Sequence, residues 1–306
     1  MYSSLTFLLA SAVAAQAASS SASAAASSPT SNPYIPTGIS DSCVEYLQTF
    51  NDDTDLATCT STLLAASSAF GPGAPNAAGA SKDAIDSALT SICSPTTTSS
   101  CPQSLIAGKL ATFYTKCALE LTSQPNKQVM TMYDTAFALL PFLQSVCSKD
   151  DDGNYCVHST NVSSSAAPAV ASVARRDSSS DATAYIPNAD TINAQNLVFL
   201  GITGSEAKSQ LCTTCTRNVL TNYISFQNTA NYAPGFQQSL LMRNEPTVYN
   251  GVVSTCGAGF LTNAVQAAGA LGGGSTTGSS GALSLRAGAS GGLSTLIGAL
   301  VAVLIL

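Results

Sequence analysis

The sequence has no tryptophan, a single histidine (His158) and few charged side chains. Lys, Arg, Asp and Glu make up 9% of the 306 residues, whereas roughly a quarter is typical of soluble domains. The net charge of −6 is spread thinly, and the longest basic stretch is Arg175-Arg176. Nucleic-acid-binding proteins usually carry clustered Lys and Arg, so this composition excludes that class of partner.

The scarcity of histidine limits the catalytic and metal-binding chemistry of the chain. A Ser-His-Asp arrangement would have to use His158, which follows Cys156 in a turn beside a Ser-rich segment. We expect that histidine to be exposed rather than catalytic. Zinc is not expected, because cysteines in an oxidising compartment form disulfides and one histidine remains as a ligand. The sequence therefore predicts no metal and no other cofactor.

The absence of tryptophan weakens the case for a glycan-cleaving enzyme. Such an enzyme needs two carboxylates in a sugar-binding cleft, and stacking on the sugar would here fall to tyrosine. The candidate carboxylates are those of Glu45, Glu120, Glu206 and Glu245. The pattern places Glu120 and Glu206 on helix surfaces, so we predict that the protein is not an enzyme.

Both ends of the chain have the composition of targeting signals. Residues 1–17 contain a short apolar stretch followed by Ala15-Gln16-Ala17, which is typical of a signal peptide cleaved after Ala17. At the other end, Leu293 to Leu306 forms an apolar run of 14 residues, about 21 Å long as a helix, against a hydrocarbon core of about 30 Å. Such a run is short for a stable span and carries no flanking Lys or Arg after it.

Small residues precede this apolar run at the spacing of a glycosylphosphatidylinositol (GPI) signal. Ser280 is followed by Gly281 and Ala282, then by a spacer and the apolar tail. We therefore expect GPI attachment at Ser280, or at Ser279, and removal of 281–306 as a propeptide. A C-terminal tail anchor is the alternative. The expected location is the outer face of the plasma membrane, the cell wall or both.

The composition divides the rest of the chain into two cysteine-bearing halves and three polar segments. The predicted divisions are a disordered Ser/Ala-rich segment (18–39), a helical half (40–158), a disordered linker (159–184), a second helical half (185–270) and a Gly/Ser stalk (271–280). The linker contains the N-glycosylation sequon at Asn161. It also contains Arg175-Arg176, which is either a dibasic processing site or an ordinary part of the linker.

Apolar residues recur at helical spacing in both halves, and alternating strand patterns are nearly absent. Ser81 is placed as an N-cap, Pro102 as the first residue of a helix, and Pro141 as a kink or a new helix start. Later helices are expected around 205–227 and 247–269. The predicted fold class is all-α, with disulfides joining the helices.

Ten cysteines in a secreted chain imply a disulfide framework. They are Cys43, Cys59, Cys93, Cys101, Cys117, Cys147, Cys156, Cys212, Cys215 and Cys256. The first half holds seven and the second three. If all pair within the chain, these odd numbers require at least one disulfide across the linker. Cys212-Thr-Thr-Cys215 has redox-motif spacing, but without a surrounding parallel sheet we interpret it as structural.

Four cysteine- and aromatic-bearing stretches are SDSCVEYLQTFNDDTDLATCTSTLLAASSAFGPG, CPQSLIAGKLATFYTKCALEL, MYDTAFALLPFLQSVCSKDDDGNYC and LCTTCTRNVLTNYISFQ. Together they resemble a fungal family of secreted proteins known as domain of unknown function 7729. The resemblance covers roughly Ser40 to Ala268. It implies a fungal source and a surface location, and it supplies no activity and no catalytic residues.

These observations predict a GPI-anchored protein of the fungal cell surface or wall with a structural or binding role. Its expected partners are the membrane, through the GPI lipid, and wall polysaccharide or other surface proteins. One alternative is a saposin-like binder of an apolar ligand between amphipathic helices, and another is a wall-remodelling glycan enzyme.

Overall fold

The fold is known from a computed structural model, which describes residues 35–70, 81–159, 170–174 and 183–261. Within these ranges the α-helices are α1 (Asp41–Asn51), α2 (Thr54–Ser67), α3 (Lys82–Ile92), α4 (Pro95–Ser99), α5 (Gln103–Lys116), α6 (Lys127–Val146), α7 (Ala189–Ala194), α8 (Lys208–Leu211), α9 (Thr214–Gln227) and α10 (Glu245–Cys256). Shorter helical turns are η1 (Ser68–Phe70), η2 (Leu119–Ser123, a π-helix), η3 (Cys156–Ser159), η4 (Leu197–Phe199) and η5 (Phe236–Gln238). The predicted all-α, disulfide-linked fold is confirmed.

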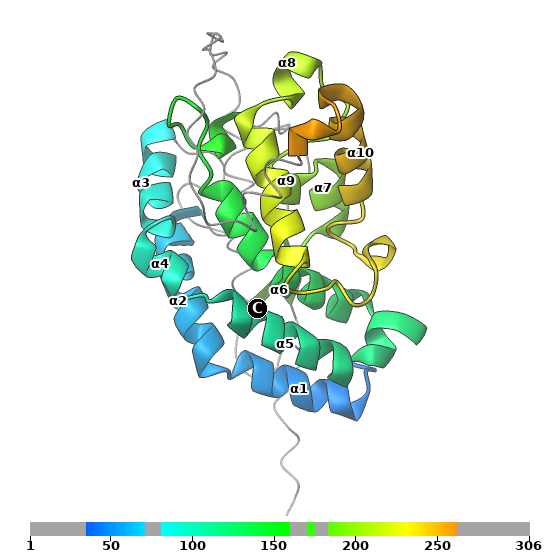
Figure 1. The fold of residues 1–306 in the computed structure, drawn as a ribbon. Helices are drawn as coiled ribbons and strands as arrows, with labels where there is room; N and C mark the ends of the chain where they lie inside the picture. The colour runs from blue at the N-terminus through cyan, green and yellow to red at the C-terminus, as the bar shows by residue number, and fades with distance from the viewer. Residues whose placement is uncertain (1–34, 71–80, 160–169, 175–182, 262–306) are drawn as a thin grey trace, which may run out of the picture. The chain divides into compact units, whose positions relative to one another are not determined.

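Helix α6 lies at the centre of the packing. It contacts α5 and α9, and also η2, η3 and η4, and Figure 1 shows α9 beside it. Sixteen of its 20 residues are buried, which is the behaviour of a helix that is apolar nearly all round. Pro141 lies inside α6, and the helix continues through it instead of ending there.

Local sequence signals set several helix starts. The Ser81 side chain accepts a hydrogen bond from Ala84 N at 3.2 Å, as its predicted N-cap role requires. Asn126 caps α6 by accepting from two backbone amides. Pro102 is itself the N-cap of α5, so this helix begins one residue later than expected.

The two cysteine-bearing halves share one core within the described residues. Leu47 and Leu63 from the first half and Val219 and Val252 from the second are completely buried in the same apolar cluster. A chain of contacting rings runs through this core and consists of Tyr46, Phe50, Phe113, Tyr133, Tyr232, Phe236, Phe137 and Phe226. Such edge and tilted contacts add to the burial of the rings. The halves therefore fold together.

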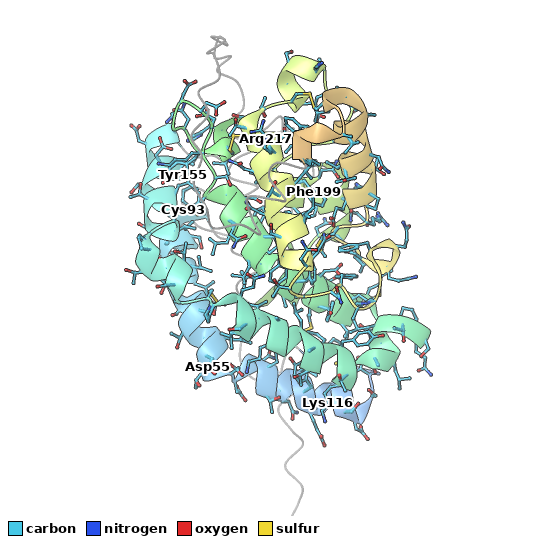
Figure 2. All side chains as sticks on the ribbon, viewed as in Figure 1. Asp55, Cys93, Lys116, Tyr155, Phe199 and Arg217 are labelled. Atoms are coloured by element: carbon cyan, nitrogen blue, oxygen red, sulfur yellow. A yellow bond between two sulfur atoms is a disulfide. The ribbon has the colours of Figure 1, made fainter. Side chains whose placement is uncertain are left out.

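All ten cysteines are paired in five disulfides, several of which are visible as sulfur bonds in Figure 2. The pairs are Cys43–Cys117, Cys59–Cys101, Cys93–Cys147, Cys156–Cys215 and Cys212–Cys256. Cys156–Cys215 joins the first half to the second, as the odd cysteine numbers predicted. Each pair links residues 42 to 74 positions apart, so each removes much chain entropy from the unfolded state.

Two of these disulfides explain an equal spacing in the sequence. Cys43 and Cys59 are as far apart as Cys101 and Cys117, and the pairs are nested, first with last. Nested pairing at equal spacing requires the α1–α2 segment to run antiparallel to the α5 segment. Contacts between α1 and α5 agree with this arrangement. The spacing therefore reflects one cross-linked layer and not a repeated hairpin.

The region predicted to be a disordered linker contains regular backbone structure. Strand β1 (Val170–Ala174) pairs antiparallel with β2 (Thr183–Pro187), with Val170 opposite Pro187. Val, Ile and Tyr favour strands, and here two short segments containing them pair with each other. Residues of β2 also approach α6. The boundary predicted at 184 therefore falls within a strand.

Several predicted features lie outside the described residues. They are the signal peptide with Ala17, the sequon at Asn161, the pair Arg175-Arg176, the stalk (271–280), the attachment residues Ser279 and Ser280, and the propeptide (281–306). Of the 18–39 segment, only residues from 35 onward are described. Among the helices that the structure describes, none has the length and apolar character needed to cross a membrane.

Candidate functional site

His158 differs from the exposed histidine that we expected. Its side chain is only 16% exposed, and its Nε2 lies 2.5 Å from Oδ1 of Asp86 in α3. The other oxygen of Asp86 pairs with Lys82. Burial raises the pKa of Asp86, but the hydrogen bonds from Lys82 and His158 outweigh burial and hold this pKa below its ordinary value. The pair connects η3 to α3 and uses both carboxylate oxygens.

The four candidate glutamates do not gather into one site. Glu45 is exposed on α1, and Glu206 lies in a loop before α8, where its carboxylate accepts from the backbone amides of Thr203 and Gly204. Glu120 is 4% exposed, contrary to the predicted helix-surface position. It lies in the π-helical turn η2 rather than in a regular α-helix, and its Oε1 accepts from the backbone amide of Ser40 at 2.6 Å.

The sulfurs of Cys43 and Cys117 lie close enough to a Glu120 oxygen to resemble a metal-ligand set. These sulfurs are bonded to each other. Only a thiolate is a strong metal ligand, and a disulfide sulfur is not. The group therefore does not fit a metal centre while the disulfide is intact.

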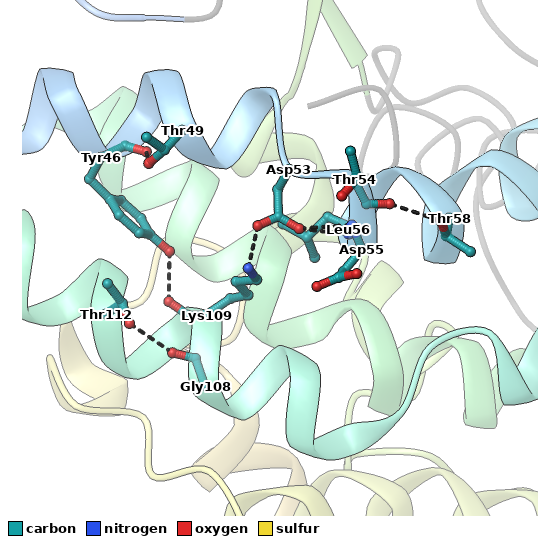
Figure 3. Close-up of polar contacts among 10 residues, drawn as sticks. All are labelled: Tyr46, Thr49, Asp53, Thr54, Asp55, Leu56, Thr58, Gly108, Lys109 and Thr112. Atoms are coloured by element: carbon teal, nitrogen blue, oxygen red, sulfur yellow. Dashed lines mark hydrogen bonds and ion pairs between the residues drawn. The ribbon is translucent and has the colours of Figure 1, made fainter.

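An ion pair joins α2 to α5 in the first half (Figure 3). Asp53 is the N-cap of α2 and accepts from the backbone amides of Asp55 and Leu56. Its second oxygen pairs with Lys109 of α5. The hydroxyl of Tyr46 donates to the Lys109 carbonyl at 2.7 Å. Burial raises the pKa of Asp53, but its three partners, Lys109 and the backbone amides of Leu56 and Asp55, outweigh burial and hold this pKa below its ordinary value, so Asp53 is a charged structural residue.

Among the acidic residues that the structure describes, Asp134 in α6 is the most buried, with no exposed surface. Oδ1 accepts from the Tyr232 hydroxyl. Oδ2 accepts from Ser239 Oγ at 3.0 Å, from Leu240 N at 2.6 Å and from Leu241 N at 3.0 Å. Burial raises the pKa of Asp134 to about 6, against the opposite effect of these hydrogen bonds. The carboxylate fixes the 232–241 segment onto α6.

A second polar cluster follows along the same segment and consists of amides. Asn193 Nδ2 donates to the carbonyls of Ala189 and Leu240. Asn244 Nδ2 donates to the Asn193 carbonyl at 3.0 Å and to Asn196 Oδ1 at 2.8 Å. These bonds hold α7 and its following turn against the start of α10.

Glu245 begins α10 beside this cluster. Gln227 of α9 donates to its Oε1, and its Oε2 is buried without a hydrogen-bond partner. Burial is the largest influence on this carboxyl and raises its pKa to about 7, although the Gln227 bond lowers it. Glu245 is 9% exposed and, like Asp134, belongs to the interior of the fold.

The backbone beside the amide cluster is strained. Asn196 and Leu200 have φ values of 48° and 50°, in the left-handed region that non-glycine residues seldom adopt. They flank η4, whose Val198 carbonyl accepts from the buried Tyr223 hydroxyl at 2.6 Å. The hydrogen bonds of Asn196 and Tyr223 hold this turn in place. The amides of Asn193, Asn196 and Asn244 and the hydroxyl of Tyr223 therefore form a junction, in which hydrogen bonds hold α7, α9 and α10 against one another.

Sequence reasoning missed this junction. Only the separate Asp134 cluster has a signal in the sequence, because a lone acid within an otherwise apolar helical stripe usually indicates a buried and fully bonded carboxylate. The amides of Asn193, Asn196 and Asn244 gave no such signal, because isolated asparagines are common in loops and at helix ends.

Cys212 and Cys215 are not bonded to each other. Each belongs to a different disulfide, with Cys256 and Cys156 respectively. The motif begins α9, with Thr213 as the N-cap and Cys215 in the first turn. Through these two disulfides the motif joins η3 and α10 to the start of α9.

Comparison with known proteins gives no match to a family model, a curated protein or a solved structure.

Proposed function

We propose that this is a GPI-anchored protein at a fungal cell surface or wall, where its two disulfide-linked helical halves (the head) have a structural or binding role. The observation that carries this proposal is the pairing of all ten cysteines across the helical fold. Such a framework forms and persists in oxidising compartments, which include the secretory lumen and the cell exterior. The composition of 280–306 supports attachment to a lipid at Ser280 or Ser279.

The interior of the fold favours a non-catalytic role over the glycan-enzyme alternative. Within the described residues, the carboxyls of Asp134 and Glu245 have a raised pKa, which is the kind that a general acid requires. Both are buried, and Asp134 is already bonded to four donors of its own chain. They support the packing of the C-terminal half instead of facing a polysaccharide.

Phospholipase release tests the location. Washed membranes of the expressing cells are treated with phosphatidylinositol-specific phospholipase C, and the soluble and pelleted fractions are blotted for the head. The proposal expects release into the soluble fraction. Retention in the pellet, with lipid acylation and wall cross-linking excluded chemically, would overturn it in favour of a tail anchor.

A matched pair of variants tests the attachment site. The double variant Ser279→Leu/Ser280→Leu places bulky residues where the transamidase requires small ones, so surface display should be lost. Ser275→Leu changes the stalk by one similar substitution away from the site and should leave display unchanged. Equal surface display of both variants would contradict attachment at these serines.

A further inference from the structure

The Cys212-Thr-Thr-Cys215 motif lies at the N-terminus of the 14-residue helix α9. Thr213 caps the helix by accepting from Thr216 N at 3.3 Å, and Cys215 lies in the first turn. Cys212 immediately precedes the cap. Backbone amides at a helix N-terminus carry partial positive charge, which stabilises a nearby thiolate and lowers the pKa of its cysteine.

The two disulfides that meet at this motif differ in exposure. Cys215 and Cys156 are 7% and 2% exposed, so their disulfide is closed to an external thiol. Cys212 and Cys256 are both half-buried, and their disulfide is the accessible one. Cys93–Cys147 is accessible to a similar degree, but it has no further cysteine three positions away.

We infer that Cys212-Thr-Thr-Cys215 is a thiol–disulfide exchange centre, in which opening of Cys212–Cys256 transfers the disulfide to Cys212–Cys215 and frees Cys156. The external reductant is a dithiol. One of its thiolates attacks Cys256 Sγ, forms a mixed disulfide and releases the Cys212 thiolate. The second thiol of the reductant then resolves the mixed disulfide, so the reductant leaves as a disulfide and Cys256 becomes a thiol.

The second step is internal to the protein. The Cys212 thiolate attacks Cys215 Sγ, the Cys212–Cys215 bond forms, and the Cys156–Cys215 bond breaks with Cys156 leaving as a thiolate that takes a proton. In total two disulfides become one, two thiols appear at Cys156 and Cys256, and the dithiol supplies both electrons. Exchange of this kind proceeds by thiolate attack on a disulfide sulfur.

Proximity and the helix terminus both favour the internal step. Cys212 immediately precedes the N-cap and Cys215 lies in the first turn, so the two-residue tether Thr213-Thr214 keeps Cys212 close to Cys215 without a diffusional encounter. Cys156 is bonded to Cys215 and therefore leaves at the same helix end, where its negative charge is stabilised. Asp151 opposes this effect, because its carboxylate also lies there and accepts from Thr214 Oγ1 at 2.8 Å.

Exchange would change what the disulfides connect. Cys156–Cys215 ties η3 to α9 and crosses from the first half to the second, whereas Cys212–Cys215 spans only the start of α9. Freeing Cys256 also releases the end of α10 from α8. A single reduction event at the surface would therefore remove both long-range links of the second half.

Graded reduction of the full-length protein tests the exchange. Folded protein is treated with increasing dithiothreitol, quenched with N-ethylmaleimide and mapped by mass spectrometry of its peptides. Molecules in which Cys212–Cys256 has opened should carry label on Cys156 and Cys256 and contain a Cys212–Cys215 disulfide. Label on Cys212 and Cys256 with Cys156–Cys215 intact would overturn the inference.

Two single variants give the same test without a reductant. Cys256→Ser leaves Cys212 without its partner, so the thiol should be found at Cys156, with Cys212 bonded to Cys215. Cys147→Ser is the matched control, because it opens the other accessible disulfide, and its thiol should remain at Cys93. A thiol that stays at Cys212 in a Cys256→Ser protein with native circular dichroism would contradict the exchange. If this variant does not fold, the graded reduction of the native chain decides.

Discussion

Asp134 of α6 accepts a hydrogen bond from the hydroxyl of Tyr232, which lies 98 residues later in the chain. The same carboxylate accepts from Ser239 and from two backbone amides. The Tyr232 ring also contacts the ring of Tyr133 from the first half, with centroids 5.5 Å apart. One carboxylate therefore organises a long irregular segment that has few helical hydrogen bonds of its own.

Removal of this carboxylate should be among the more destabilising single changes in the fold. Asp134→Ala leaves four buried donors without an acceptor, and each costs about 1–3 kcal/mol before relaxation. Because these losses are not additive, we expect the free energy of unfolding to fall by about 3–5 kcal/mol. Urea unfolding followed by circular dichroism measures it. Asp152→Ala, at an exposed turn, is the control and should change stability by less than about 0.5 kcal/mol.

The helical fold could be predicted from the sequence because its signals are local. Apolar spacing located α3, α5, α6 and α9, and the cap at Ser81 is confirmed. The odd cysteine numbers of the two halves also predicted a disulfide across the linker, now seen as Cys156–Cys215. The helices and the cap can be inferred from residues close together in the sequence, and the disulfide across the linker from the number of cysteines in each half.

The polar contacts were not predictable in this way, because each depends on residues brought together by the complete fold. His158 and Asp86 lie 72 positions apart, and no residue near His158 in the sequence indicates that Asp86 is its partner. The sequence pattern predicts Glu120 on the surface of a regular helix, whereas the chain forms the π-helical turn η2 there and Glu120 is buried against other parts of the fold. The disulfide partners likewise depend on which helices lie antiparallel.

The raised pKa of Glu245 predicts a specific dependence of stability on pH. Its pKa is 4.5 ordinarily and about 7 in the fold, so the folded state favours the neutral carboxyl. The stability that this provides is complete below about pH 4.5 and is lost as the pH rises through about 7. With about 1.4 kcal/mol per pKa unit, the loss is up to about 3 kcal/mol.

Glu245→Gln should remove this dependence while it keeps the acceptor for Gln227. Urea unfolding at pH 5 and pH 8 should therefore show a smaller loss of stability in the variant than in the natural chain. The part that remains reflects Asp134, whose pKa is also raised, to about 6. Glu45→Gln, at an exposed position, should leave the pH dependence unchanged. An unaltered pH dependence in Glu245→Gln would contradict the assignment to Glu245.

The N-cap at Asp53 supplies a prediction for the first half. Asp53→Ala removes two hydrogen bonds to the start of α2 and the partner of Lys109, so we expect a loss of about 1–2 kcal/mol. Asp55→Ala removes an exposed acid from the same first turn and should cost only a few tenths of a kcal/mol, about the value of its interaction with the helix dipole. Thermal unfolding of the two variants side by side measures the difference. Equal losses would show that the cap and ion pair contribute nothing beyond charge.

The contact between Gly251 of α10 and Gly204 gives the sharpest steric prediction. A Cβ on Gly251 would lie 2.3 Å from the Gly204 carbonyl oxygen, and this neighbour is backbone that cannot rotate away. Gly204 also has a φ of +82° and lies against the Val248 backbone, so its loop has little room to move. Gly251→Ala should therefore destabilise the fold by about 1–3 kcal/mol although alanine is the better helix former.

Gly108 of α5 is the matched control for this substitution. It too is a glycine inside a helix, but a Cβ introduced there would have no other atom within 4 Å. Gly108→Ala should stabilise the protein by about 0.5–1 kcal/mol, because only the helix preference changes there. Urea unfolding should thus give opposite signs for the same chemical change at two helical sites. Stabilisation by both substitutions would mean that α10 can move away from the Gly204 loop at little cost, and that the close approach of these backbones does not constrain the second half.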